Sequence, residues 1–198
     1  HLAFADYFFE TNDLENAEAR YKQVLKFPKS NAFWYAMYKI GWIDLNKQKE
    51  GEALEIFQKV AEATKGDPKQ EVLNRASKKD YVRAYATAGK TNLAFQAFKR
   101  IDDKYAFTML GLLADLYLEQ GKNDKAIVTY QEMIKNEPKD KNVCLWQYNI
   151  TRAMLTAGDN DQKIREIETL VKMYGALKGK KILPAAEAEE CRDNAAAM

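Results

Sequence analysis

The stretch Ala-Gly-Lys-Thr at residues 88–91 is the first place where this sequence could hold a phosphate. In nucleotide-binding loops, backbone amides, a lysine and a hydroxyl all point at one anion. The complete motif also needs a glycine five residues before the Gly-Lys-Thr, and position 84 is alanine. No strand is expected before it either. We therefore interpret residues 88–91 as a turn between two helices.

Groups for acid–base or metal chemistry are few. His1 is the one histidine of the sequence, which excludes a Ser–His–Asp triad, a Cys–His pair and a multi-histidine metal site. Adjacent carboxylates such as 102–103 and 189–190 point apart on a helix and are expected to be solvated. The sequence therefore predicts no catalytic residues, no cofactor and no metal site, and hence no enzyme activity within these residues.

Cys144 and Cys191 are the two cysteines of the sequence. They are too few for a disulfide framework or a structural zinc site. The sequence favours two small, partly buried thiols on neighbouring helices. A single bridge between them is the alternative, and it would need an oxidising compartment.

The composition narrows the class of partner. Apolar residues make up 46% and charged residues 30% of the chain, as in a soluble globular protein. The 31 basic residues nearly balance the 29 acidic ones, for a net charge of +2. That balance indicates neither nucleic acid nor an anionic membrane surface as a partner. No apolar run approaches the roughly 18 to 20 residues that span a bilayer.

A repeated apolar pattern predicts where the helices of this chain lie. An alanine is followed by an aromatic residue four positions later and a bulky aliphatic residue three positions after that. The four copies are Ala17/Tyr21/Val24, Ala53/Phe57/Val60, Ala94/Phe98/Ile101 and Ala126/Tyr130/Met133, and a weaker fifth is Lys163/Ile167/Leu170. Residues spaced in this way share one face of a helix. Each copy therefore predicts a helix with one buried stripe.

A second helix precedes each stripe. Twelve residues before the anchor stands a mostly small residue, namely Ala5, Gly41, Val82, Ala114 or Thr151. A small residue allows two helix axes to approach closely. Five residues before the last three anchors stands a glycine, at positions 89, 121 and 158, and in the first copy Asn12 takes that place. These residues are expected to adopt positive φ and to end the first helix of each pair.

Each unit is thus an antiparallel pair of helices that cannot bury its stripe alone. Stacking buries a continuous core. We predict an all-α fold: a right-handed superhelical solenoid of about five antiparallel helix pairs plus a C-terminal capping helix. The array is expected over residues 1–175, with units near 1–29, 30–66, 68–103, 105–138 and 140–175. A loop over 176–183 and a helix over 184–198, continuing beyond the last residue, follow.

The pattern resembles the tetratricopeptide repeat. The fourth copy matches best, through Leu113, Ala114, Tyr117, Gly121, Ala126, Tyr130 and Pro138. The second copy departs at Asp44, where the repeat has an aromatic residue, and the fifth is degenerate. The resemblance covers roughly residues 1–175. It implies a non-catalytic protein–protein interaction scaffold that binds a peptide or a partner helix in a concave groove lined by the first helix of each pair.

The expected groove mixes aromatic rings with charges. Counted from the small buried residue of each copy, the groove-facing residues are Tyr35, Tyr38, Trp42, Lys79, Arg83, Asp115, Glu119, Tyr148 and Arg152. Rings supply contact area at low entropic cost, and Arg or Lys can hold a carboxylate. The alternative is that Tyr38 and Trp42 pack against the next helix pair. The two-carboxylate clamp of chaperone-cofactor members is not expected, because Asp6 and Trp42 stand where it needs asparagine.

The segment from Tyr38 to Val60 is similar to repeats of bacterial envelope proteins, including outer-membrane assembly lipoproteins. The tail from residue 183 is similar to periplasmic scaffold proteins of gliding-motility systems. These resemblances imply a periplasmic or envelope-associated scaffold, with the cytoplasm as the alternative location. A regulatory or attachment module of a larger enzyme and a self-associating structural spacer are the alternative functions. A protein or peptide partner, no nucleic acid, no membrane span and a possible homo-oligomer are expected.

Overall fold

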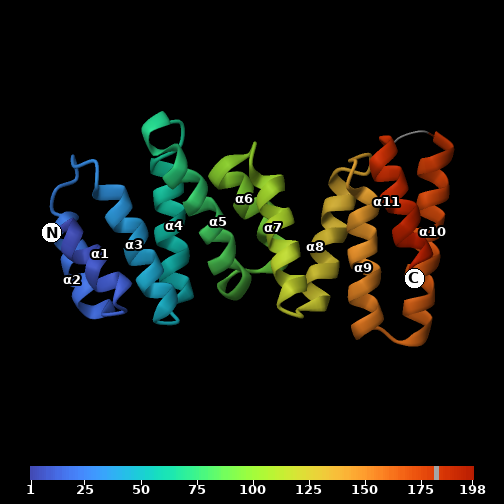
Figure 1. Cartoon of the computed structure of the whole chain (residues 1–198), viewed down its shortest axis with the longest axis horizontal. Coiled ribbons are helices and arrows are strands. Elements are labelled where there is room, and N and C mark those ends of the chain that lie inside the picture. The colour runs from blue at the N-terminus through green and yellow to red at the C-terminus, as the bar shows by residue number, and fades with distance from the viewer. Residues whose placement is uncertain (181–182) are drawn as a thin grey trace. The chain divides into compact units, whose positions relative to one another are not determined.

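A computed structural model describes residues 1–180 and 183–198, and these residues form helices and turns without a strand (Figure 1). The all-α prediction is confirmed. The α-helices are α1 (Leu2–Glu10), α2 (Leu14–Val24), α3 (Phe33–Asn46), α4 (Glu50–Ala63), α5 (Glu71–Ala88), α6 (Ala94–Asp102), α7 (Ala106–Glu119), α8 (Asn123–Asn136), α9 (Val143–Ala157), α10 (Asn160–Lys180) and α11 (Ala185–Ala196). Two short 3-10 helices, η1 (Pro68–Gln70) and η2 (Thr91–Leu93), precede α5 and α6.

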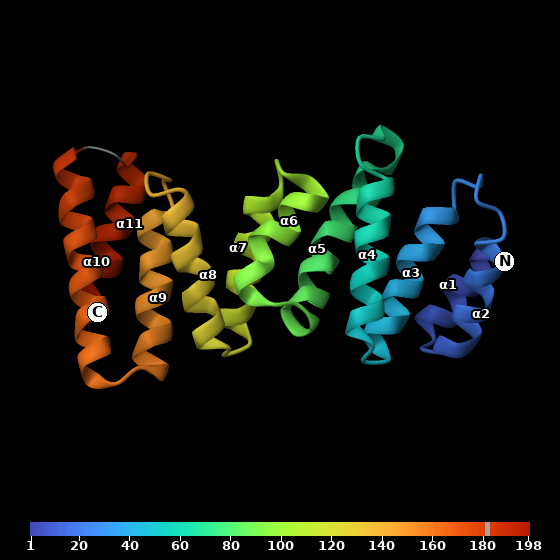
Figure 2. The same ribbon diagram turned by 180° about the vertical axis from the view of Figure 1, so that it is seen from behind.

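The chain forms two compact units, residues 1–109 and residues 110–198. In the first unit, α1 packs on α2, α2 on α3, α3 on α4 and α4 on α5. In the second unit, α8 packs on α9 and α9 on α10, and the short turn between α9 and α10 is clear from behind (Figure 2). The predicted pairs α1/α2, α3/α4 and α9/α10 thus pack as expected.

The small residues of the repeat lie where two helices approach closely. All five of them, Ala5, Gly41, Val82, Ala114 and Thr151, are buried. In the second copy a Cβ added to Gly41 would lie 2.8 Å from Cε1 of Phe57. Alanine at this position would therefore force the aromatic ring of α4 to move.

The apolar stripes form the core. The four anchor alanines and the four aromatic residues that follow them are at most 1% exposed. In the degenerate fifth copy Leu170 is fully buried, whereas Lys163 and Ile167 are partly exposed. The stripe predicted from the sequence is confirmed in four copies and reduced to its last residue in the fifth.

Three of the five turns share one backbone conformation. Asn12, Gln48 and Gly121 have φ of 61°, 58° and 67°. In each turn the next residue donates its amide to a carbonyl five residues back, which is the hydrogen bond of a Schellman motif: Asp13 to Phe8, Lys49 to Asp44, and Lys122 to Tyr117, all at 2.8 Å. The positive φ predicted for Asn12 and Gly121 is confirmed, and Gln48 adopts it as well.

The same prediction is wrong for Gly89 and Gly158, whose φ values are −86° and −82°. Glycine is needed at both positions because a Cβ atom would collide with a neighbouring side chain. A Cβ at Gly89 would lie 2.3 Å from Cδ1 of Tyr85, and one at Gly158 would lie 2.5 Å from Sδ of Met154. The chain leaves both helices in an extended conformation and folds back over a large side chain.

Two glycine-to-alanine substitutions should have opposite effects on stability. An added Cβ would meet no atom within 4 Å at Gly51 in α4 or at Gly121, so packing does not distinguish them. Gly51→Ala should raise the free energy of unfolding by about 0.5 kcal/mol through helix propensity. Gly121→Ala should lower it by about 1 kcal/mol because alanine disfavours positive φ. Urea denaturation measures both, and a change of the same sign would contradict the role of φ.

The helix α10 is longer than predicted. It continues to residue 180, whereas the sequence indicates a loop from residue 176. Gly175 lies within the helix with open space around it, and Leu177 is buried, so packing of the following turn outweighs the helix-breaking tendency of glycine. Residues 181 and 182 of the predicted loop lie outside the described residues. The predicted C-terminal helix is confirmed as α11.

A disulfide joins α9 to α11. Cys144 and Cys191 are bonded, with a Cα–Cα distance of 5.6 Å. The interpretation as two separate thiols is therefore wrong, and the alternative of a bridge is confirmed. The helix α11 packs against both α9 and α10, which brings the two cysteines together. Cys191 is the one buried residue of α11, so the bridge is a principal attachment of this alanine- and glutamate-rich helix.

Candidate functional site

Two aromatic residues of α3 meet a buried carboxylate of α5. The hydroxyl of Tyr38 donates a hydrogen bond to Oδ2 of Asp80 at 2.6 Å, and the indole Nε1 of Trp42 donates to the same oxygen at 3.2 Å. Asp80 is 5% exposed. Buried Tyr and Trp need a partner for their polar atoms, and this carboxylate holds both rings in place.

Arg83 completes this cluster one turn after Asp80. Its Nη1 lies 3.6 Å from Oδ1 of Asp80, and its guanidinium carbon lies 5.0 Å from the centre of the Trp42 ring. About half of the Arg83 side chain is exposed. Burial, and then the hydrogen bond to Asp80, raises the pKa of Tyr38 to about 12. The phenol therefore stays a neutral donor at physiological pH.

A second carboxylate, Asp6 of α1, accepts hydrogen bonds from Tyr21 at 2.6 Å and from Tyr35 at 3.2 Å. Burial, and then the charge of Asp6, raises the pKa of Tyr35 to about 12. Lys39, one turn after Tyr35, places its ammonium nitrogen 4.0 Å from the ring centre of Phe9. The same nitrogen lies 5.7 Å from the centre of the Tyr35 ring.

A pocket of about 420 Å³ opens between α1, the turn that follows it and α3. Aromatic, aliphatic and amide side chains line it around one ammonium group. The lining residues are Phe9, Asn12, Leu14, Tyr38, Lys39, Trp42 and Asn46. Such a lining can bury an apolar side chain on the rings and hold a carboxylate on the ammonium group.

Four of the predicted groove residues belong to the second unit. Asp115 accepts a hydrogen bond from the hydroxyl of Tyr130 at 2.6 Å. The guanidinium carbon of Arg152 lies 5.6 Å from the ring centre of Tyr148. Glu119 is exposed. Asp115 thus joins α7 to α8, and a pocket of this unit is lined by other residues, namely Gly121, Lys122, Asn123, Asp124, Lys125 and Ala157.

The structure brings three of the five predicted groove residues of the first unit into one cluster, namely Tyr38, Trp42 and Arg83. The interpretation that Tyr38 and Trp42 pack against the next helix pair also has support, because both bind Asp80 of α5. Tyr35 turns to Asp6 instead, and Lys79 lies exposed on α5.

Sequence reasoning missed Asp80 and Lys39, and it noted Asp6 only as a departure from the two-carboxylate clamp. A signal was present for Asp80, which lies two residues before the small residue Val82 and therefore on the side of α5 that faces the preceding pair.

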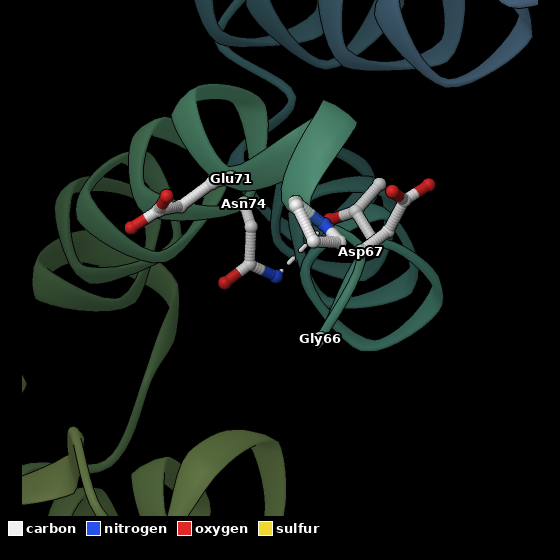
Figure 3. A pocket seen from close by; sticks show the side chains of 6 residues that line it. Gly66, Asp67, Glu71 and Asn74 are labelled. Atoms are coloured by element: carbon white, nitrogen blue, oxygen red, sulfur yellow. Dashed lines mark hydrogen bonds between the residues drawn. The ribbon is translucent and has the colours of Figure 1, made fainter.

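A second pocket, of about 290 Å³, lies at the end of α4 and is lined by Thr64, Gly66, Asp67, Pro68, Glu71 and Asn74 (Figure 3). The polar groups of this pocket make hydrogen bonds that stabilise the fold. The amide of Asn74 donates to the carbonyl of Ala61 at 2.6 Å and to the Thr64 hydroxyl at 3.0 Å. Asp67 accepts the amide of Lys69 and thereby caps η1. These bonds close the end of α4 and the start of α5 rather than prepare a ligand site.

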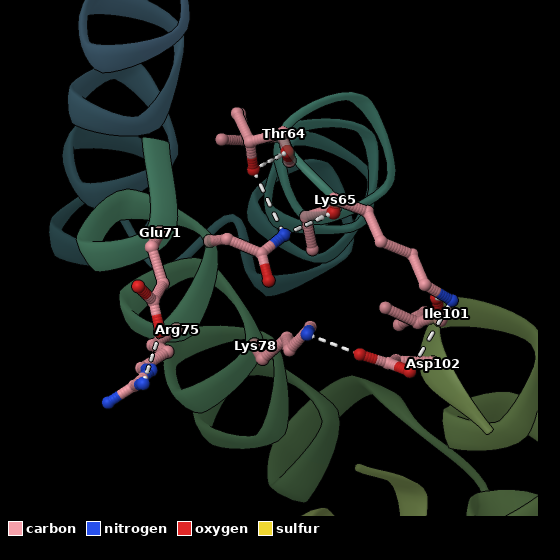
Figure 4. A network of polar contacts seen from close by, with 10 residues as sticks. Thr64, Lys65, Glu71, Arg75, Lys78, Ile101 and Asp102 are labelled. Carbon is pink, nitrogen blue, oxygen red and sulfur yellow. Dashed lines mark hydrogen bonds and ion pairs between the residues drawn. The ribbon is translucent and has the colours of Figure 1, made fainter. Parts of the chain in front are cut away.

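A polar network ties α5 to the end of α6 (Figure 4). Lys78, whose side chain is 7% exposed, lies 2.5 Å from a carboxylate oxygen of Asp102. Lys65 lies 3.4 Å from the other carboxylate oxygen and donates to the carbonyl of Ile101. Both lysines thus face the negative end of α6, where a cation is favoured.

Residues 1–180 and 183–198 hold neither a metal-binding cluster nor a membrane-spanning helix. No group of three or more histidine, cysteine or carboxylate side chains there could hold a metal ion. No helix in the same residues has the length and apolarity to cross a bilayer.

One tetratricopeptide repeat model matches residues 2–68, and a second matches residues 112–140. These two segments are tetratricopeptide repeats. The first repeat segment contains α1 to α4 and every residue that lines the pocket of about 420 Å³, and the second contains most of α7 and all of α8. Such repeats generally mediate protein–protein interactions and are typically non-catalytic. The two repeat models say nothing about a bacterial envelope, so the assignment of this protein to the envelope stays a prediction.

Solved structures with tetratricopeptide-like folds are similar to this chain at low identity. The MamA protein is 18% identical over 90% of this chain and 92% of that chain, with a TM-score of 0.47. A Podosopora anserina protein assigned as a kinesin light chain, with nearly identical TPR-like repeats, is 14% identical over 89% of this chain and 93% of its own, also with a TM-score of 0.47. No curated protein matches the chain significantly.

Proposed function

We propose that this protein is a non-catalytic scaffold that binds a peptide or partner helix at the pocket of the first unit. The observation that carries the proposal is the aromatic platform of Tyr38 and Trp42, fixed by Asp80 and flanked by Lys39 and Arg83. The rings are held before a ligand arrives, so binding costs little side-chain entropy.

The charges select the chemistry of the ligand. Lys39 lines the pocket, and Arg83 stacks on Trp42 beside it with half of its side chain exposed. The Asp80 carboxylate is buried beneath the rings and already accepts their hydrogen bonds. A peptide that carries a carboxylate next to a large apolar side chain therefore matches this site. The apolar group would cover the rings, and the carboxylate would lie between the two cations.

We further propose that the scaffold works in an oxidising compartment, with the bacterial periplasm or envelope as the location. The Cys144–Cys191 disulfide supports this, because such bonds persist mainly outside the cytosol. The measurement is alkylation of free thiols in intact cells. Modification of both cysteines in the natural host would place the protein in a reducing compartment instead.

Two labelled peptides test the pocket. They have the same length, and one alternates aspartate with leucine while the other alternates asparagine with leucine. Fluorescence polarisation should show about tenfold tighter binding of the aspartate peptide, because a charged hydrogen bond to Lys39 or Arg83 is lost with asparagine. The variant Trp42→Ala/Arg83→Glu should bind the aspartate peptide at least about tenfold more weakly.

Arg75→Glu is the matched control, because it reverses the same charge on the same helix two turns away from Arg83, outside the pocket lining. It should leave the affinity within about twofold of the wild type. Equal binding of the two peptides would contradict the role of the carboxylate. Unchanged binding by Trp42→Ala/Arg83→Glu would remove this pocket from the function.

A further inference from the structure

Residues 25–32, the α2–α3 loop, present an aromatic ring to solvent. The loop projects past the end of α2 and the start of α3 (Figure 1), and Phe27 in it is 62% exposed. Lys26 and Lys29 on either side of the ring are exposed as well. Neither lysine makes an ion pair with a residue that the structure describes. The tip of the loop is thus a ring between two ammonium groups.

The exposure of Phe27 belongs to its position in the repeat. Phe27 stands ten residues after the anchor alanine of its copy. The equivalent residues of the next three copies are also exposed, and they are small or polar: Ala63, Lys104 and Asn136. The fold therefore leaves this position in water even in copies that have a repeat on both sides. An aromatic residue here is not part of a helix-packing face.

Hydrogen bonds hold the backbone of the loop on both sides of the ring. The amide of Phe27 donates to the carbonyl of Val24 at 3.0 Å, and the amide of Ser30 donates to the carbonyl of Phe27 at 2.9 Å. The amide of Phe33 in turn donates to the carbonyl of Ser30 at 3.0 Å. Pro28 fixes its own φ. The ring is therefore presented on an ordered turn, so its insertion into a partner costs little backbone entropy.

The charge around the loop has one sign. Residues 19–43 contain no acidic residue, and their five basic residues are Arg20, Lys22, Lys26, Lys29 and Lys39. The net charge of +2 hides this local excess, because it sums over the whole chain. A surface that binds the loop should therefore be anionic, with an apolar layer that the ring can enter.

We propose that the α2–α3 loop binds the surface of an anionic lipid bilayer. Phe27 enters the boundary between headgroups and acyl chains, where aromatic rings are favoured. Lys26 and Lys29 lay their apolar stems along this boundary and keep their ammonium groups at the lipid phosphates. Each lysine near an anionic leaflet adds to the attraction. The contact is reversible, because one ring and a few charges do not anchor a protein permanently.

A single-stranded nucleic acid is the other anion that combines with rings and lysines. It binds along a groove in which successive bases stack on several rings. The α2–α3 loop offers one ring at a projecting tip, and a broad bilayer surface fits such a tip better.

Vesicle flotation with the whole chain tests the proposal. One set of vesicles is phosphatidylcholine alone, and the other contains about a third phosphatidylglycerol. The wild type should bind the anionic vesicles at least about tenfold more tightly. Phe27→Ala should weaken this binding about tenfold, because the ring no longer enters the bilayer. Lys26→Glu/Lys29→Glu should reduce it to the level of the phosphatidylcholine vesicles.

Two matched controls separate the loop from general properties of the surface. Leu93→Ala removes an apolar side chain that is 44% exposed in η2, the turn within the third pair. Lys139→Glu/Lys141→Glu reverses two exposed lysines in the corresponding loop of the fourth copy, between α8 and α9. Both controls should bind anionic vesicles within about twofold of the wild type. Circular dichroism confirms that every variant is helical.

The result does not depend on the pocket of the first unit. Trp42→Ala/Arg83→Glu should bind vesicles like the wild type, so the two proposals succeed or fail separately. Failure of the wild type to bind anionic vesicles would overturn the proposal, and so would unchanged binding by Phe27→Ala. Equal losses in the two double-lysine variants would show attraction to net charge alone. Tighter binding of a single-stranded oligonucleotide than of the vesicles would assign the loop to nucleic acid instead.

Discussion

The double substitution Cys144→Ser/Cys191→Ser is expected to lower the free energy of unfolding of the second unit by about 3–4 kcal/mol. The bridge joins residues 47 positions apart, and closing a loop of that length removes about 4 kcal/mol of chain entropy from the unfolded state. Few other contacts hold α11 in the native state, because Cys191 is the one buried side chain of this helix. Urea denaturation followed by circular dichroism measures the loss, and hydrogen exchange should show the amides of α11 losing protection first.

A reducing agent provides the control for this prediction. The reduced wild type and the cysteine-free variant should have the same free energy of unfolding. The reducing agent should not change the stability of the variant. Equal stability of the oxidised and reduced wild type would contradict the role of the bridge in holding α11.

Asp102→Ala is expected to cost about 3 kcal/mol of folding free energy. The substitution leaves the ammonium group of Lys78 buried without its carboxylate, and a charge left alone in the interior is expensive. Lys65, about half exposed, can turn to water and adds little to this cost. Chemical denaturation gives the difference, and Lys78→Met/Asp102→Leu should recover most of it because it removes both charges together.

The ion pair between Glu71 and Arg75 in the same unit is the matched control (Figure 4). Its side chains are 60% and 70% exposed, so Glu71→Ala should cost about 0.5 kcal/mol or less. Equal losses from Glu71→Ala and Asp102→Ala would show that burial does not set the strength of the Lys78–Asp102 pair.

The Lys78–Asp102 pair should also affect how the free energy of unfolding depends on pH. Burial tends to raise the pKa of Asp102, but the hydrogen bonds and charges of Lys78 and Lys65 outweigh it and leave the pKa below its ordinary value. A lowered carboxyl pKa stabilises the fold above the unfolded value, which is about 3.9, and the stabilisation disappears as the pH falls through the folded pKa. Asp102→Asn should therefore flatten the loss of stability on the acid side of about pH 4.

The fold could be predicted from the sequence because its cause is local. A stripe such as Ala126, Tyr130 and Met133 shows its helical spacing directly, and the small residue twelve positions earlier shows where the partner helix passes. Turns were harder to predict. Glycine at 121 and at 89 looks alike in a sequence, yet one adopts positive φ and the other leaves room for the Tyr85 ring. That distinction depends on a neighbouring side chain.

The candidate site could be predicted in part. The rings of Tyr38 and Trp42 were found from the register, but their partner Asp80 is 42 and 38 residues away along the chain, and its acceptor role depends on how α3 and α5 pack. Lys39 was missed because it lies on the ring of Phe9, a contact between two different helix pairs. The ligand pocket is thus a product of the spacing between helices, which no single copy of the pattern contains.

The hydrogen bond between a tyrosine of the second helix and an aspartate of the first has a consequence for how such a chain can be rebuilt. Tyr21 binds Asp6, and Tyr130 binds Asp115 fifteen residues away in the same manner, whereas the copies with Phe57 and Phe98 carry Trp42 and Arg83 at the aspartate position. Grafting one helix of a copy into another would strand a hydroxyl or a carboxylate. The smallest interchangeable module of this array is therefore the whole hairpin, cut between copies and never at the turn within one.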